Sequence, residues 1–288
     1  APPQNAGIVD NKGVELLVGY RNNIAGVVKY FVSGNLAVNN NKVVSLAGTG
    51  PYIITTVAGG DLDPRLIIRE GLPMNAHWGY KTDGLFQTAE EIARYPTYAS
   101  NTKPGDIKYV DLNMDGKINA DDMTMIGSTF PKYTYGLTSN FSFKGFELNL
   151  LFQGAADVDV RLSGALSEMG LNEGFTHEIF TNNYWTPTNT GARFPRLVKR
   201  DLRNVATSDR LIVDGSYLRL KNLQLGYNIP ASFANRLKLS FLNVYVSATN
   251  LLTFSKLNEW NLDPEVPSGR ATYYPQTSML TFGLNVQF

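Results

Sequence analysis

The segment from residue 111 to residue 122 carries oxygen-bearing side chains at a spacing that could hold a hard cation. Asp111, Asn113 and Asp115 offer such oxygens at alternate positions, and a glycine follows at position 116. In calcium-binding loops, oxygens at positions one, three and five are followed by a glycine at the sharp turn. The sequence therefore predicts a Ca²⁺ site in this segment.

The rest of the loop completes the predicted ligand set. Lys117 offers only its backbone carbonyl oxygen at loop position seven, Ile118 is the apolar anchor, and Asn119 could bind directly or through water. Asp122 takes the twelfth position, where glutamate is usual. Because aspartate is shorter, bidentate closure around the ion is harder, and Mg²⁺ is an alternative ion.

Two other interpretations of this loop exist. Asn, Asp and Gly are ordinary turn formers, so the segment could be a turn without an ion. A calcium sensor would need paired helices on both sides of the loop, and the flanking sequence lacks their pattern. The pattern favours a structural clip on a long loop.

Other reactive residue types are scarce. The chain has no cysteine, which excludes disulfides, thiolate metal sites and a cysteine nucleophile. Its two histidines, His77 and His177, stand in no recognisable triad or metal-ligand motif. A glycosidase could hold paired carboxylates at any sequence spacing, so that class stays an alternative. We expect no enzymatic activity.

Aromatic and basic residues between the predicted strands are candidates for binding a nutrient. Trp78 and Trp185 could stack on a sugar or pack against a peptide, and Arg193 could bind a carboxylate. The same chemistry is available at Trp260, Arg161 and Arg196. The alternatives are burial in a folded loop or at a membrane interface for the rings, and a solvated or partner-contacting role for the arginines.

Strands must position these residues, and the last ten residues show the clearest strand pattern. Apolar side chains occupy every second position from Leu280 to the end, and small or polar ones lie between them. The alternation predicts a strand with one apolar face, although a soluble sandwich strand can look the same. An apolar strand ending on phenylalanine is similar to the assembly signal of bacterial outer-membrane barrels. We assign this signal to Phe282, Leu284, Val286 and Phe288.

The same alternation recurs upstream, in segments close to the ~9–11 residues that a tilted strand needs to cross a bilayer. The predicted strands cover residues 14–21, 27–39, 133–143, 146–157, 217–228, 241–249 and 279–288. Residues 144–145 form a tight turn that makes a hairpin of its two neighbours. The polar positions expected to face the interior are Asn149, Gln153, Asn222, Gln224 and Asn285.

The connections between these strands alternate in length. They are short at residues 22–26, 144–145 and 229–240, and long at residues 40–132, 158–216 and 250–278. Outer-membrane barrels have short periplasmic turns and longer extracellular loops. If the chain ends on the periplasmic side, every long connection, including the metal loop, lies outside the cell, as does Ala1.

Composition agrees with a strand-rich membrane protein. The chain has 26 glycines, 15 tyrosines and 15 phenylalanines, and its net charge of +1 gives no support for a nucleic-acid partner. No apolar run approaches the ~20 residues of a spanning helix, and the start has no signal-peptide pattern. A membrane-embedded form must therefore be an all-β, antiparallel transmembrane barrel. Because an odd number of strands cannot close the usual even-stranded barrel, we expect further strands and any plug in another segment of the same protein.

The order of several short motifs resembles the C-terminal region of SusC/RagA-type TonB-dependent transporters. The main matches are residues 104–111 (PGDIKYVD), 126–127 (IG), 131–136 (PKYTYG), 144–148 (KGFEL) and 152–154 (FQG). Supporting matches are residues 11–16 (NKGVEL), 41–43 (NKV), 79–86 (GYKTDGLF), 217–222 (YLRLKN), 226–227 (GY) and 248–251 (ATNL). Each motif is weak alone, but their fixed order covers nearly the whole chain.

The resemblance implies a barrel of about 22 strands around an N-terminal plug, with residues 1–288 forming about seven C-terminal strands. It implies an integral protein of the bacterial outer membrane, embedded in outer-membrane lipid, with loops exposed outside and a SusD-like lipoprotein as a lid. It also implies active import of an oligosaccharide or oligopeptide, energised by TonB through the plug. The plug and TonB box are absent from this sequence, so energy coupling rests on the resemblance alone.

The main alternative without transport is a secreted β-sandwich that is stabilised by calcium and binds carbohydrate or mediates adhesion. Such a module would account for the strands, the metal loop and the aromatic residues. It leaves the terminal phenylalanine, the alternating connections and the ordered motifs unexplained.

Overall fold

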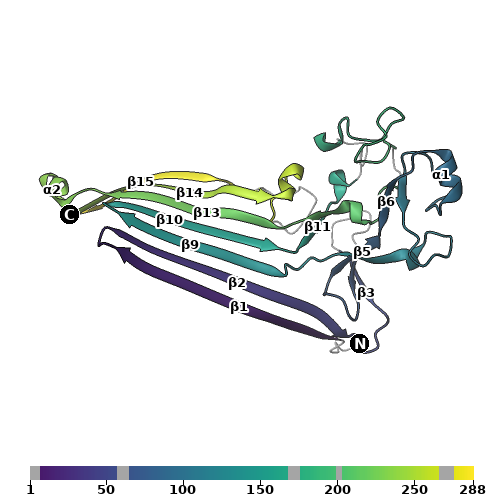
Figure 1. Ribbon diagram of the computed structural model, residues 1–288, viewed down its shortest axis with the longest axis horizontal. Helices are drawn as coiled ribbons and strands as arrows, with labels where there is room; N and C mark the ends of the chain where they lie inside the picture. Colours follow the sequence, from purple (N-terminus) through teal and green to yellow (C-terminus); the bar gives the residue numbers. More distant parts are fainter. Residues whose placement is uncertain (1–6, 57–64, 168–175, 199–202, 266–275) are drawn as a thin grey trace.

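The computed structural model describes residues 7–56, 65–167, 176–198, 203–265 and 276–288. Its long strands form one seven-stranded antiparallel sheet in which neighbours in the sequence are neighbours in the sheet (Figure 1). The strands are β1 (Ile8–Ile24), β2 (Val28–Ser45), β9 (Tyr133–Phe143), β10 (Phe146–Ala156), β13 (Tyr217–Asn228), β14 (Phe241–Ser255) and β15 (Met279–Gln287). Among the described residues, none of the helices has the length and hydropathy to cross a bilayer.

All seven predicted strands are present, and three of them are longer than predicted. β1, β2 and β14 extend beyond the predicted bounds, and β1 pairs with β2 over its whole length. The added part of β2 is rich in asparagine and has no apolar alternation, so its pattern gave no strand signal. Its end is fixed by tertiary contacts instead, because the Val43 N–H donates to the Leu72 carbonyl oxygen at 2.8 Å.

The two faces of the sheet differ in polarity. Residues paired across neighbouring strands point to the same face, and two adjacent cross-strand rows show how the faces differ from β9 to β15. One such row consists of Tyr30, Phe141, Leu148, Leu225, Val246 and Phe282. The adjacent row, on the other face, contains Asn140, Asn149, Gln224, Ser247 and Thr281. This alternation is the one expected of a barrel wall with lipid outside and a polar interior.

Aromatic rings gather on the apolar face toward the short turns. The Phe146 and Tyr227 ring centroids are 4.6 Å apart, and those of Tyr30 and Phe141 are 6.3 Å apart. Phe143 stands in the same row as Phe146. Aromatic girdles of this kind mark the membrane–water interfaces of transmembrane barrels.

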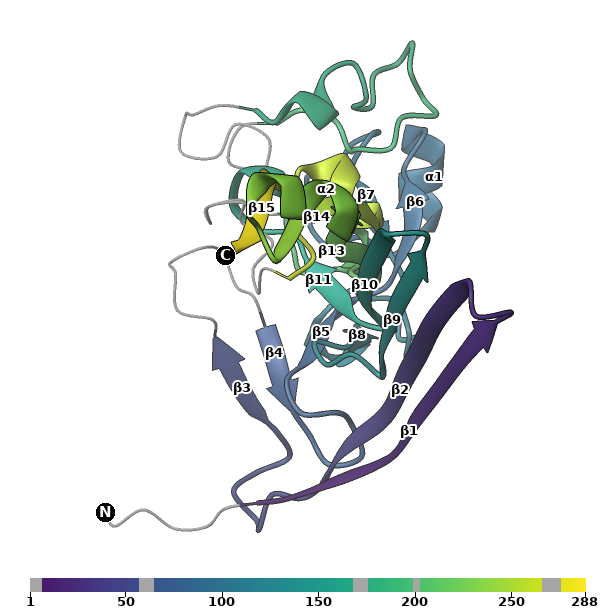
Figure 2. The ribbon, with the colours of Figure 1, turned by 90° about the vertical axis from the view of Figure 1, so that its left-hand side faces the viewer.

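The short connections lie at one end of the sheet and the long connections at the other (Figure 1). Lys144 and Gly145 both have positive φ, 47° and 88°, as the tight hairpin turn between β9 and β10 requires. The short connection before β14 contains α2 (Ala231–Ala234) and the 3₁₀ turn η6 (Asn235–Leu237), seen in front of the sheet in Figure 2. The predicted alternation of connection lengths is therefore confirmed in space.

The described parts of the three long connections fold into what we call the loop body. It contains the sheet order β3 (Ile53–Thr56), β4 (Arg65–Ile68), β5 (Ala76–Tyr80), β8 (Met123–Gly127). Two further strand pairs are β6 (Thr82–Leu85) with β7 (Ile107–Tyr109), and β11 (Asp159–Arg161) with β12 (Ile212–Asp214). Its helical elements are α1 (Ala89–Arg94), η1 (Ala120–Asp122), η2 (Gly164–Leu166), η4 (Glu178–Phe180), η5 (Asp209–Leu211) and η7 (Lys256–Trp260).

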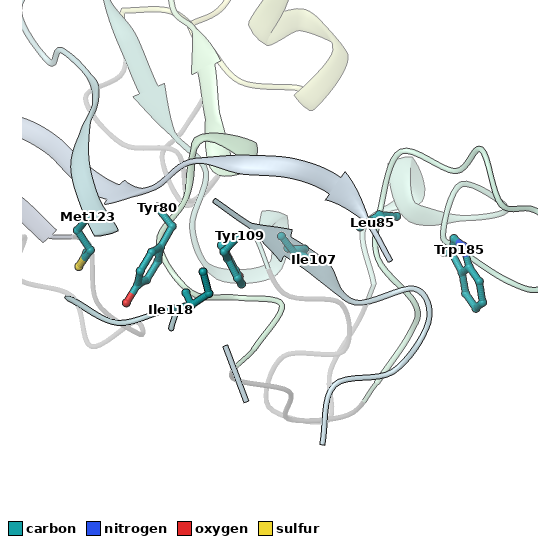
Figure 3. Close-up of a cluster of buried hydrophobic side chains, with 7 residues drawn as sticks. All are labelled: Tyr80, Leu85, Ile107, Tyr109, Ile118, Met123 and Trp185. Atoms are coloured by element: carbon teal, nitrogen blue, oxygen red, sulfur yellow. The ribbon is translucent and has the colours of Figure 1, made fainter. Parts of the chain in front are cut away.

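Two clusters of buried apolar side chains hold the loop body together. The first cluster consists of Tyr80, Leu85, Ile107, Tyr109, Ile118, Met123 and Trp185. Figure 3 shows Ile118 beside Tyr80 and Tyr109, with Leu85 and Trp185 toward the other end. The second cluster consists of Leu162, Leu166, Phe180, Leu257, Trp260 and Leu262. The loop body thus has a core of its own, as a folded domain does.

Candidate functional site in the loop body

The two ends of the predicted metal loop are held together by carboxylates. Asp111 Oδ2 accepts a hydrogen bond from the Gly116 N–H at 2.8 Å. Asp122 is fully buried, and its two oxygens accept from the N–H groups of Leu112 and Asn119, both at 2.9 Å. The twelfth residue of the loop therefore reaches back to the second, which closes the loop.

In the middle of the loop, side-chain oxygens likewise accept hydrogen bonds from backbone N–H groups of the loop itself. Asn113 Oδ1 accepts from the Asp115 N–H at 3.0 Å, and Asp115 Oδ1 accepts from the Lys117 N–H at 2.9 Å. Gly116 has φ of 83°, so the sharp turn lies at the predicted position. Ile118 is buried in the first cluster, where an apolar anchor of the loop would lie.

The loop has the wound shape of a calcium loop, but its oxygens are engaged with backbone N–H groups. Among the described residues, no group of three or more His, Cys, Asp or Glu side chains is arranged to hold a metal ion. The ligand set of Asp111, Asn113, Asp115, Lys117, Asn119 and Asp122 stays a prediction.

A buried carboxylate joins two distant segments of the loop body. Asp106 is only 1% exposed, and its Oδ1 accepts from Arg196 Nε at 2.6 Å and from Asn204 Nδ2 at 2.9 Å. Arg203 Nη1 lies 3.8 Å from Asp106 Oδ2. Arg196 was a candidate for binding an external anion, and the structure pairs it with this internal carboxylate instead.

The predicted ligand contacts do not converge on one site. Trp185 is 8% exposed, and its Nε1 donates to Gln87 Oε1 at 3.0 Å. Trp78 packs against the first cluster, with the Arg69 guanidinium 5.4 Å from its ring centroid. Both tryptophans therefore have structural contacts, and their role as substrate contacts stays a prediction. Arg193 differs, because it lines a cavity.

This cavity has a volume of about 410 Å³ and lies between the two apolar clusters. Arg193, Arg210 and Trp260 are among its lining residues. The sequence gave no reason to single out Arg210, because the residues that surround it come from three different connections of the barrel.

A charged contact also holds the last long connection against the sheet. On β13, Arg219 Nη2 donates to Asp263 Oδ2 at 2.7 Å, and Lys221 Nζ lies 2.9 Å from Glu265 Oε2. Arg219 Nη1 lies 3.3 Å from the same Glu265 oxygen. Because Arg219 is almost fully buried, these pairs fix the described start of that connection to the polar face of the wall.

His77 makes the loop body sensitive to acid. Its side chain is 6% exposed, and its Nε2 lies 3.3 Å from the Asp159 carbonyl oxygen. Burial lowers the pKa of His77 to about 4, and the nearby Arg161 acts in the same direction. The folded loop body therefore holds this ring neutral, whereas an unfolded one protonates near pH 6.5.

We expect the loop body to lose about 3 kcal/mol of stability as the pH falls from 6.5 to 4, because only the unfolded form takes up this proton. Burial raises the pKa of Asp159, which acts in the opposite sense, so a variant is needed to isolate the effect. Limited proteolysis at pH 7 and pH 4.5, with a protease that is active at both pH values, measures this loss. The increase in cleavage of the loop body from pH 7 to pH 4.5 should be smaller in His77→Gln than in the parent protein. Equal sensitivity in the two proteins would contradict this assignment.

Comparisons with known proteins match almost the whole chain. The TonB-dependent receptor P3 of Formosa agariphila is 32% identical, and the TonB-dependent receptor SusC of Bacteroides thetaiotaomicron is 27% identical, each over 99% of this chain. The solved structure of the RagAB peptide transporter superposes with a TM-score of 0.77 at 24% identity, again over 99% of this chain. The chain spans 29% and 27% of those two relatives and 30% of that structure. No family model matches.

Proposed function

Because this chain belongs to the SusC/RagA-type TonB-dependent receptors, of whose length it matches about 30%, we propose that it forms part of an importer that carries a nutrient across the bacterial outer membrane. The seven-stranded sheet is a part of the transmembrane barrel wall of this fold. The observation that carries the proposal is the separation of an apolar face from a polar face across the strands from β9 to β15, with every long connection at one end of the sheet.

The proposed partners follow from this arrangement. The outer strands β1 and β15 each pair on one side only within the described sheet, so the remaining strands of the barrel would continue from them. The polar face would line the interior around a plug, through which TonB supplies energy. The loop body would face outward, beneath a SusD-like lipoprotein lid.

In this mechanism the loops bind an oligosaccharide or oligopeptide and no bond of the substrate is changed. Movement of the plug would then open the way to the periplasm. The two substrate classes differ in chemistry, because sugars stack on aromatic faces whereas peptides carry charged termini. The structurally similar RagAB is described as a peptide transporter, so peptides are the substrate class of that protein.

A pull-down in detergent from the native membrane tests the proposal. Mass spectrometry of the co-purified proteins should find the remaining barrel and plug together with a SusD-like lipoprotein. Uptake of labelled oligopeptides and oligosaccharides by cells with and without the transporter would then name the substrate class. A protein that stays monodisperse in plain buffer without these partners would support the calcium-stabilised β-sandwich instead.

We also propose that the loop of residues 111–122 binds Ca²⁺ as a structural clip, with Mg²⁺ as the alternative ion. The support is the shape of the loop: its closure through Asp122, its turn at Gly116 and its anchor at Ile118. A carboxylate has about four lone-pair sites, so Asp111 and Asp115 could bind the ion with lone pairs that their backbone N–H partners do not use.

Calcium should therefore protect the loop body from proteolysis. At a concentration of 100 times the Kd, binding stabilises the folded state by about 2.7 kcal/mol. We expect EDTA to remove this protection, Ca²⁺ to restore it better than Mg²⁺, and the double variant Asp111→Ala, Asp115→Ala to be insensitive to both. Asp121→Ala, in an exposed residue outside the ligand set, is the matched control. Protection by Ca²⁺ that survives in the double variant would refute this site.

A further inference from the structure

The cavity between the two clusters has the size and walls of a small-molecule site. Its volume of about 410 Å³ is within the range of roughly 300–1,000 Å³ that is usual for ligand pockets. Aromatic rings from different connections form part of its wall, namely Phe180 and Phe194 from one and Trp260 from another. The Phe194 ring packs edge-on against both, with centroids 4.6 Å from Phe180 and 6.0 Å from Trp260.

The charge of the wall has one sign. Arg193 and Arg210 line the cavity, and none of its described lining residues is an aspartate or a glutamate. The Arg193 guanidinium lies 5.2 Å from the Trp260 ring centroid and 5.4 Å from that of Phe194, so it stands over the aromatic wall. Within the described wall itself, no side chain carries a negative charge that would balance these two guanidinium groups.

Arg210 has little internal compensation. Its Nη2 donates to the Arg193 carbonyl oxygen, and within the described residues Arg210 forms no ion pair. Burial lowers the pKa of Arg210, and the neighbouring Arg193 acts in the same direction, whereas Tyr109 and Asp209 act against it without forming an ion pair with Arg210. Arg193 itself pairs with Glu259, whose side chain is largely exposed.

We propose that this cavity binds a compact organic carboxylate, with the carboxylate between Arg193 and Arg210 and the apolar body of the ligand against the aromatic wall. A guanidinium fork matches a carboxylate in two parallel hydrogen bonds, and aromatic faces cover an apolar chain or ring. A bare inorganic anion would leave the apolar walls unused. The inference rests on the proposed function, because it names the chemistry of an end group of the imported nutrient.

Two nutrient types carry this group, the C-terminus of a peptide and a uronic acid of a glycan. Calorimetric titration of the complete transporter in detergent separates them with two matched pairs of probes: N-acetyl-Leu-Phe against its C-terminal amide, and glucuronic acid against glucose. We expect the acid of at least one pair to bind at least tenfold more tightly than its neutral partner. A preference for one acid supports the proposal and identifies the source, and a preference for both acids supports a site that accepts either source. No preference for either acid overturns the proposal.

Variants test the placement of the carboxylate. Arg210→Gln should weaken acid binding at least tenfold and leave binding of the neutral probe unchanged, whereas Arg236→Gln, in the short turn at the opposite end of the sheet, should change neither. Glu259→Gln should tighten acid binding several-fold, because it removes the internal competitor for Arg193. Because Arg210→Gln could disturb the loop fold, this gain in Glu259→Gln is the independent check, and unchanged or weaker binding there overturns the proposal.

Cell uptake is measured separately from binding. If acids bind but the transporter imports none of the tested oligosaccharides or oligopeptides, the proposed function fails and the cavity assignment holds. If import occurs and no acid preference is found, only the cavity assignment fails.

Discussion

Replacing Phe282 with arginine is expected to abolish stable insertion of the transporter in the outer membrane. The Phe282 side chain is 77% exposed within this chain and lies in a wholly apolar cross-strand row with Val246 and Leu225. That row faces lipid if the sheet is a barrel wall. Arginine on the lipid face near the bilayer midplane costs about 2–4 kcal/mol, and the cost falls toward the interfaces.

The matched control is Thr281→Arg, one residue away at almost the same depth but on the polar face with Ser247. We expect this variant to assemble normally, as judged by outer-membrane fractionation and by heat-modifiable migration of the folded barrel. An equal loss of membrane assembly in Phe282→Arg and Thr281→Arg would show that the lipid-facing and interior faces of the sheet are assigned wrongly.

Phe282 is also part of the predicted assembly signal, so its effect has a second possible origin. Val246→Arg separates the two, because Val246 pairs directly with Phe282 on the same face but lies in β14, outside the terminal strand. Loss of membrane insertion in both variants would indicate that both side chains face lipid. Loss of membrane insertion in Phe282→Arg alone would indicate that Phe282 is part of the assembly signal in the terminal strand.

The barrel wall could be predicted from sequence because its determinants are local. Each strand must sort its side chains between lipid and interior, so the period of two is present within every segment of about ten residues. Short turns such as residues 144–145 then fix the register of the neighbouring strands. The one systematic error was length, since β1, β2 and β14 pair beyond the segments in which apolar and polar residues alternate.

The loop body could not be predicted in the same way, because its contacts join distant parts of the chain. β5 pairs with β8 across more than forty residues, and Arg219 reaches Asp263 in the next long connection. Residue type was also ambiguous: Trp185 has the ring expected of a sugar-binding residue, yet it is buried in the first cluster. The metal loop is the exception, since its turn and anchor are set by spacing within twelve residues.

Replacing Asp106 with alanine should have the largest effect on the loop body. The carboxylate is 1% exposed and compensates Arg196, whose Nε lies 2.6 Å away. Removing one member of a buried ion pair typically costs about 3–5 kcal/mol. Because about 1.4 kcal/mol corresponds to a tenfold change in an equilibrium constant, the opened fraction should rise by about 100-fold or more.

Limited proteolysis of the complete transporter measures this opening, since cleavage tracks the open fraction when opening and closing are fast. Asp10→Ala is the matched control, because its partner Lys12 is largely exposed and such surface pairs contribute about 0–1 kcal/mol. Cleavage of Asp106→Ala at the rate of this control would contradict a structural role for the buried pair.

The two partners of the buried pair should not be equivalent. Without Arg196, the Asp106 carboxylate still accepts from Asn204 and has the Arg203 guanidinium within 3.8 Å. Without Asp106, the positive charges of Arg196 and Arg203 lie close together and lose the acceptor they share. Arg196→Ala should therefore open the loop body less than Asp106→Ala does, and the opposite order would show that Asp106 is not the centre of this contact.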